Sequence, residues 1–187
     1  MTTHKRQDVL AAALKMVSIH GFHGASMAMI AEEAHSGAGT IYNYFPSKET
    51  LIKALFQEIK TEYARAILEG VDLTRSLEDR FLQMWKNAVR FNIECPEKVA
   101  FSQQYHTSPY YDEESLRFIN ETMAPVIEPI VEAMQQGLLK RLPLPVLDAY
   151  TLEIAASLAL RHSRGEIVLD EAMIEQTGRA SWQALRA

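Results

Sequence analysis

The sequence has little cysteine and no long apolar run. Cys95 is the only cysteine among 187 residues, so no disulfide can form within one chain, as is usual in a reducing compartment. The first residues, MTTHKRQD, are polar and charged, and no apolar stretch reaches the roughly 18 residues of a membrane span. These absences predict a cytoplasmic protein without a membrane partner.

The sequence also lacks the strict alternation of apolar and polar residues that indicates a β-strand, and it contains no internal repeat. Apolar residues recur instead at helical spacing in one segment after another. This pattern predicts an all-α fold, with three N-terminal helices followed by about six that form a larger helical body.

No constellation typical of catalysis or metal binding is present. The glycines of Gly37-Ala38-Gly39 are too close together for a phosphate-binding P-loop, and the lysine of that motif is missing. His20, His23 and His35 invite a metal site, since the first two are three residues apart, but no cysteine or further histidine nearby completes it. Glu-x-x-His, the ligand motif of di-iron bundles, occurs once, at Glu32–His35, whereas a di-iron site takes two copies of it. The sequence therefore predicts no enzyme activity, no metal and no cofactor.

The net charge of −5 is unevenly distributed along the chain. Residues 1–60 carry six Lys and Arg against five Asp and Glu, whereas residues 61–187 carry thirteen against nineteen. The acidic excess therefore lies outside the N-terminal part. This distribution permits a nucleic-acid partner for the N-terminal part without arguing for one.

The stretch from Ser26 to Lys48, SMAMIAEEAHSGAGTIYNYFPSK, has the spacing of two short helices joined by a turn. Apolar residues recur at i, i+3, i+4 and i+7 from Met27, and Ser26 can cap this first helix. Residues 35–37 suit a turn, and an apolar pair spanning 41–45 indicates the second helix. Two helices this short cannot bury a core alone, so the stretch predicts a module that presents a surface.

The second helix presents side chains that can contact nucleic acid. Ile41 and Phe45 are expected to point toward the core of the module, and Pro46 ends the helix. Other residues of this helix carry hydroxyl, amide and phenol groups, which contact phosphates and base edges. These residues are Thr40, Tyr42, Asn43 and Tyr44.

The pattern A-x-x-A-x-x-G-x-G-T-I-Y-x-Y-F-x-x-K-x-x-L resembles the DNA-binding signature of TetR-type transcriptional regulators. The resemblance runs from Val9 to about Phe56 and is closest in GTIYNYFPSKETL, residues 39–51. Where the family usually has Gly, an apolar residue and Ser, this chain has His35, Ser36 and Gly37. Histidine tolerates the left-handed backbone, so we expect the turn to survive, with Ser36 supplying the capping hydroxyl that Gly37 lacks.

This resemblance implies a sequence-specific regulator, namely a repressor released from a palindromic operator by a small-molecule ligand. Thr40 and Asn43 are expected near base edges in the major groove, with Tyr42, Tyr44 and Lys48 on phosphates. The unusual turn residues leave one alternative, a helical protein-binding adaptor with a degenerate DNA-binding module. The predicted DNA-binding residues are Ser26, Ser36, Gly37, Ala38, Gly39, Thr40, Tyr42, Asn43, Tyr44 and Lys48.

A helix precedes this motif. Thr3 can cap it, and Gly21 suits its end. With the family in view, Lys5 and Arg6 are expected to reach the phosphate backbone of DNA. Further N-cap residues precede the later helices, namely Ser47, Ser76 and Asp170.

The predicted domains are a helix-turn-helix domain over 1–46, with its motif at about 27–46, and a ligand-binding and dimerisation body over 47–187. A helix over 47–69 links the two. One recognition helix reads only a few base pairs, so we expect a homodimer that presents two half-sites. Its interface is predicted on helices 146–164 and 170–186, whose apolar residues include Leu158, Ile174, Trp182 and Leu185.

Aromatic residues at helical spacing in the body predict a largely apolar cavity for an aromatic or apolar ligand. Each of them can equally fill space in the core. Pro125 and Pro129 fall inside one helical segment and predict a kink or a brief break there. The predicted lining residues are Tyr63, Trp85, Phe91, Phe101, Tyr105 and Met123.

Overall fold

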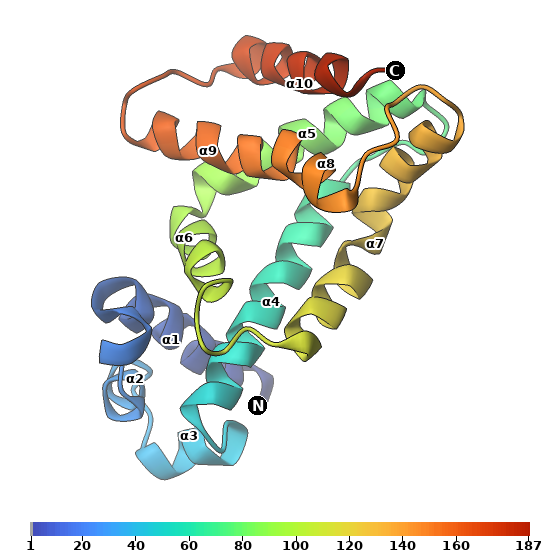
Figure 1. Cartoon of the computed structure of the whole chain (residues 1–187). Helices are drawn as coiled ribbons and strands as arrows, with labels where there is room; N and C mark the ends of the chain where they lie inside the picture. Colours follow the sequence, from blue (N-terminus) through green and yellow to red (C-terminus); the bar gives the residue numbers. More distant parts are fainter. Residues whose placement is uncertain (1) are drawn as a thin grey trace. The chain divides into compact units, whose positions relative to one another are not determined.

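The computed structural model describes residues 2–187, without the side chains of Thr2, Thr3 and Ala38. The predicted cap at Thr3 and the side-chain contact predicted for Ala38 therefore lie outside the described residues. Within them the fold is all-α, as predicted (Figure 1). No helix of the described part is long and apolar enough to cross a membrane. The helices are α1 (Thr2–Gly24), α2 (Met27–Glu33), α3 (Ala38–Tyr44), α4 (Lys48–Leu68), α5 (Leu77–Glu94), α6 (Pro96–Tyr105), α7 (Glu113–Gln135), α8 (Leu144–Tyr150), α9 (Leu152–Ser163) and α10 (Glu171–Leu185).

The chain forms two compact units, whose bounds differ from the predicted domains. The first comprises the chain up to Lys60 together with Glu97–Ile119. The second comprises Thr61–Pro96 and Asn120–Ala187. The continuous helices α4 and α7 therefore each contribute residues to both units. The first unit holds more than residues 1–46, because α6 and the start of α7 belong to it.

Aromatic rings from distant parts of the chain build the core of the first unit. Phe56 of α4 stacks on Tyr105 of α6 with ring centroids 3.9 Å apart. Phe22 of α1 approaches Phe101 of α6 at 5.3 Å. All four side chains are buried. Packing of this kind ties α6 to the helix-turn-helix module, although α6 follows that module by some fifty residues of sequence.

Helices α4, α5 and α10 each begin directly after the residue that was predicted to cap them. Ser47 accepts a hydrogen bond from the Thr50 N–H, Ser76 from Asp79, and Asp170 from Met173. All three predicted caps are confirmed. Such caps satisfy N–H groups that have no partner within the helix, so short-range sequence determines where these helices begin.

Helix α7 runs through Pro125 and Pro129 without interruption, so the predicted brief break is wrong. Each proline removes one donor from the helix, which leaves the carbonyls of Glu121 and Pro125 without their usual i+4 partner. The remaining hydrogen bonds of a helix of 23 residues hold it together on either side.

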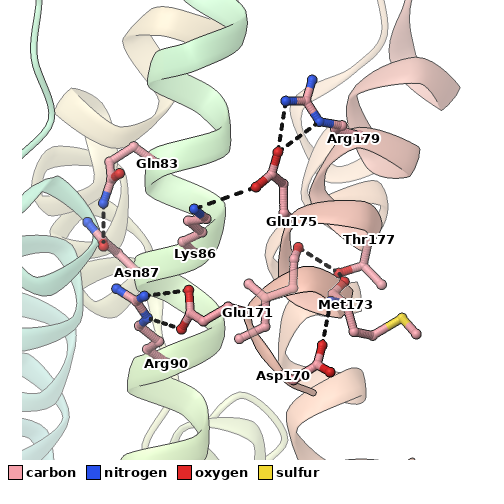
Figure 2. A network of polar contacts seen from close by, with 11 residues as sticks. Gln83, Lys86, Asn87, Arg90, Asp170, Glu171, Met173, Glu175, Thr177 and Arg179 are labelled. Atoms are coloured by element: carbon pink, nitrogen blue, oxygen red, sulfur yellow. Dashed lines mark hydrogen bonds and ion pairs between the residues drawn. The ribbon is translucent and has the colours of Figure 1, made fainter. Parts of the chain in front are cut away.

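In the second unit, α5 is the helix against which α9 and α10 pack. The buried small residues Ala155 and Ala159 allow α9 to come close to its neighbours. On α10, Gly178 lies against the indole of Trp85, and Trp182 approaches Phe81 with ring centroids 5.2 Å apart. Exposed ion pairs flank the junction of α5 and α10, among them Arg90–Glu171 at 2.7 Å (Figure 2).

Candidate functional site

The first helix of the motif, α2, begins as predicted. Ser26 is its N-cap, and the Ser26 hydroxyl accepts a hydrogen bond from the Met29 N–H at 3.2 Å. Ile30 and Ala31 point into the core of the first unit, where they are almost completely buried. The Ser26 hydroxyl is therefore occupied inside the module.

The turn between α2 and α3 survives its unusual sequence. His35 adopts the left-handed backbone, with φ at +46°, as predicted. The Lys5 ammonium donates to the carbonyls of Ala34 and His35, at 3.0 and 3.1 Å. A cation at this position satisfies carbonyls at the end of a helix and interacts favourably with the helix dipole. Lys5 thus stabilises the turn from α1.

Ser36 does not cap α3, so that expectation is wrong. Gly37 is the N-cap residue of α3, and no side chain caps this helix. The Ser36 hydroxyl is buried and has no hydrogen-bond partner among the described residues. The physical reason is position, because Ser36 precedes the N-cap, and only the N-cap side chain reaches the N–H groups of the first turn.

Helix α3 has one buried face and one exposed face. Ile41 and Phe45 are 1% and 3% exposed, which confirms their predicted inward direction. Thr40 and Asn43 are exposed, and Tyr42 is 50% exposed. Tyr44 is partly buried and packs against the core of the module.

Gly39 lies on the same helix with an ordinary helical backbone. A Cβ atom added at Gly39 would meet nothing within 4 Å. Neither backbone strain nor crowding inside the module therefore requires glycine at this position. The open surface around Gly39 continues the exposed side of α3.

Several cations near the motif already have interaction partners within the first unit. Arg6 pairs with Glu58 at 3.5 Å, and its guanidinium lies over the Phe45 ring. Lys48 approaches the carbonyl of His23 at 3.5 Å, and its partial burial lowers the pKa of its ammonium group. Both Lys5 and Arg6, which were expected on DNA phosphates, thus have partners inside the first unit.

The structure distributes the six predicted ligand residues over both units. Phe101 and Tyr105 belong to the core of the first unit, where the Tyr105 hydroxyl bonds to the Tyr110 carbonyl and the Ser115 hydroxyl. The other four lie in the second unit. There Tyr63 and Phe91 are in contact, with ring centroids 5.1 Å apart. Trp85 packs against α10, and Met123 is buried in α7.

Asn92, which sequence reasoning missed, lies beside this pair. Its side chain hydrogen-bonds with Tyr63 and is only 5% exposed. The available signal was its position, because Asn92 follows Trp85 by seven residues and Ala88 by four, on the apolar stripe of α5. A polar residue on such a stripe requires an explanation.

The prediction that certain apolar residues form the dimer interface also needs a correction. Ile174, Trp182 and Leu185 are all 5% exposed or less within the single chain. They are buried because α10 packs this face on α5 of the same chain, as the contact of Trp182 with Phe81 shows. The exposed apolar residues nearby include Leu144, Tyr150, Ile154, Leu160 and Met173.

A capped α2, a tight turn and a short helix with one exposed polar face together define a helix-turn-helix protein with a helical C-terminal body. Two family sequence patterns match the chain, one over its N-terminal part and one over its C-terminal part. "Bacterial regulatory proteins, tetR family" matches residues 9–55, and "Tetracyclin repressor-like, C-terminal domain" matches residues 76–186. The chain therefore belongs to the TetR family of DNA-binding transcriptional regulators, which is not a family of enzymes.

Similar proteins match most of the chain. An HTH-type transcriptional regulator of Haemophilus influenzae is 25% identical over 184 residues, covering 98% of this chain and 97% of that protein. The transcriptional repressor NicS of Pseudomonas putida is 29% identical over 154 residues, covering 79% and 71%. The crystal structure of a TetR family regulator from Marinobacter aquaeolei VT8 matches with a TM-score of 0.93 and 25% identity, covering 97% and 95%.

Proposed function

We propose that the protein is a repressor that binds a palindromic operator as a homodimer and is released from it by a small molecule. The exposed side of α3 carries this proposal, since Thr40, Tyr42 and Asn43 face solvent while Ile41 and Phe45 hold the helix in place. The similar protein NicS is a repressor, which supports repression rather than activation by this protein.

In this proposal α3 enters the major groove. Thr40 and Asn43 contact base edges, and Tyr42 and Lys48 contact phosphates. Tyr44 reaches a phosphate only with its hydroxyl end, because its ring packs on the module. Gly39 brings the backbone of α3 close to the DNA, because no side chain separates the two.

The dimer uses the outer faces of α8, α9 and α10. Tyr150, Ile154 and Met173 are 36–45% exposed in the single chain, and exposed apolar side chains on these helices support an interface there. Replacing Tyr150 and Ile154 together by Glu should convert the dimer to a monomer of 21.2 kDa in sedimentation. Leu116→Glu is the control, since Leu116 is similarly exposed but lies in the first unit. A parent protein that sediments as a monomer would contradict the proposed dimer.

The test of the whole proposal has two stages. Genomic fragments are first selected with the purified protein and sequenced, and a shared palindrome is the expected result. Compounds that raise the thermal midpoint of the protein are then added to the complex in a mobility-shift assay. Release of the palindrome by at least one compound supports the proposal. Failure to shift any fragment would favour the protein-binding adaptor instead.

A further inference from the structure

The second unit contains a groove of about 340 Å³, which is lined by α5, α10 and the connection between α4 and α5. Small-molecule sites have volumes of about 300 to 1,000 Å³, so this groove is large enough for one. It holds the volume of about ten water molecules, which suits a small organic molecule rather than a single inorganic ion. We call it the polar groove, because seven of its ten lining residues are charged.

Four cations line the polar groove, and they come from three segments of the chain. Arg75 belongs to the connection between α4 and α5, Arg80 and Lys86 belong to α5, and Arg179 belongs to α10. Only three carboxylates accompany them, whereas residues 61–187 as a whole carry thirteen Lys and Arg against nineteen Asp and Glu. The polar groove therefore gathers positive charge within an acidic part of the chain.

The three carboxylates of the polar groove already accept hydrogen bonds from the protein. Asp72 accepts from the N–H and the hydroxyl of Thr74, at 2.9 and 2.7 Å. Asp79 accepts from the Ser76 hydroxyl at 2.8 Å. Glu175 accepts two hydrogen bonds from the guanidinium on α10, at 2.9 and 3.2 Å. The negative charge of the lining is thus engaged locally.

The cations of the polar groove have more unused capacity. The exposed guanidinium of Arg75 forms no hydrogen bond or ion pair with another described residue, although a neighbouring carboxylate attracts it. The side chain of Arg80 is only 13% exposed, and Glu132 engages its Nη1 at 3.4 Å. Its Nε is buried without a hydrogen-bond partner among the described residues. Lys86 Nζ lies 3.9 Å from Glu175, beyond hydrogen-bond distance (Figure 2).

We propose that the polar groove binds a small phosphate monoester, as a second ligand of the protein. A phosphate group carries a charge of about −1.5 to −2 at pH 7 and three acceptor oxygens. Because these oxygens point in different directions, they can accept from cations on several segments at once. A carboxylate offers one planar pair of oxygens, which matches a single guanidinium. In the part of the chain that the structure describes, no three His, Cys, Asp or Glu side chains gather to hold a metal ion instead.

This inference goes beyond the proposed function. None of the six residues predicted to bind an apolar ligand lines the polar groove. In the proposed arrangement Arg75 and Lys86 donate to the phosphate, because they have the fewest partners in the protein. Arg80 is held by Glu132 and contributes its charge from a fixed position.

The experiment measures binding to the full-length protein by titration calorimetry, at constant ionic strength and without DNA. Glycerol 3-phosphate is the probe, since it is a phosphate monoester of about the required size. Glycerol is the neutral match, and succinate is the dicarboxylate match. Glycerol 3-phosphate should bind saturably and more tightly than succinate, and glycerol should not bind.

Arg75→Gln and Lys86→Gln should each weaken the binding of glycerol 3-phosphate about tenfold, as expected for the loss of one charge-assisted hydrogen bond. Arg75→Gln should leave the thermal midpoint of the free protein unchanged, because its guanidinium has no bonded partner. Arg90→Gln is the matched control. Arg90 is also a cation of α5, but it pairs with Glu171 at 2.7 Å and does not line the polar groove. It removes the same charge and should change the affinity less than about twofold.

Three results would overturn the inference. The first is the absence of saturable binding by glycerol 3-phosphate. The second is equal or tighter binding of glycerol or succinate, which would exclude recognition of the phosphate group. The third is equal weakening by Arg75→Gln and Arg90→Gln, which would indicate a response to net charge rather than a site. Because no DNA is present, each result is independent of the proposed repressor function.

Discussion

Gly178 of α10 lies so close to Trp85 of α5 that a Cβ atom on residue 178 would approach Cδ1 of the indole to 2.8 Å. That separation is shorter than a van der Waals contact, and Trp85 is held by the surrounding core. Gly178→Ala should therefore lower the free energy of unfolding by about 1–3 kcal/mol, as overpacking does. Urea unfolding of the parent and the variant measures the change.

Gln176→Ala is the control for Gly178→Ala, because Gln176 is exposed on the same helix. It should change the stability by less than about 0.5 kcal/mol. If Gly178→Ala is as stable as this control, α10 is not seated on Trp85 as described.

His35 in the left-handed region is strained, since a residue with a Cβ atom costs about 1–2 kcal/mol there. His35→Gly should raise the thermal midpoint by relieving this strain, although the flexibility of glycine in the unfolded chain offsets part of the gain. His35→Ala removes the same imidazole but keeps the strain, so it should not stabilise. Equal midpoints for the two variants would show that the backbone conformation is not the cause.

Asp112 gives stability a defined dependence on pH. A hydrogen bond from Lys53 at 2.7 Å, helped by the N–H and hydroxyl of Ser115, holds the pKa of the Asp112 carboxyl well below its usual value. Since the folded-state pKa is depressed, the stabilisation is present above the unfolded pKa of about 3.9 and is lost as pH falls below it. Asp112→Asn should therefore lower the thermal midpoint at pH near 7, and the difference from the parent should narrow below about pH 3.

Asparagine still caps the first turn of α7, so Asp112→Asn isolates the charge from the cap. Glu113→Gln is the matched control, because Glu113 is an exposed carboxylate in the same turn, and it should show a smaller effect. A difference between Asp112→Asn and the parent that stays constant from about pH 7 to pH 2 would contradict the role of the carboxylate.

Lys48 and Asn43 should affect DNA binding in different ways. Lys48→Ala should weaken binding to all sequences and reduce the slope of log K against log salt by about 1. Asn43→Ala should change base preference at one position of each half-site. Lys5→Met provides the contrast, because Lys5 donates to Ala34 and His35, and its loss should lower the thermal midpoint rather than the salt slope. Equal loss of specificity from Lys48→Ala and Asn43→Ala would contradict these assignments.

Gly39→Ala should separate stability from function. The fold has room for the methyl group, and alanine is better than glycine in a helix by about 0.5–1 kcal/mol. The variant should therefore be at least as stable as the parent in thermal unfolding. Its affinity for the selected palindrome should fall, because the methyl group would lie between α3 and the DNA. Unchanged affinity would mean that Gly39 lies away from the contact.

Local spacing in the sequence determined the all-α fold and the helix-turn-helix motif. The caps at Ser26, Ser47, Ser76 and Asp170 and the inward direction of Ile41 and Phe45 could all be predicted. Each depends on residues within one or two helical turns, and such short-range contacts are encoded in the order of the residues themselves.

The tertiary structure alone decided which partners distant side chains take. Tyr105 stacks on Phe56, Trp182 lies on Phe81, and Lys5 reaches the end of α2. Helical spacing assigned Tyr105 and Trp182 to a face without saying which helix would cover it, and Lys5 was expected on DNA. The burial of Asn92 is of the same kind, because a polar residue becomes exceptional only when the chain has folded around it and withdrawn water from it.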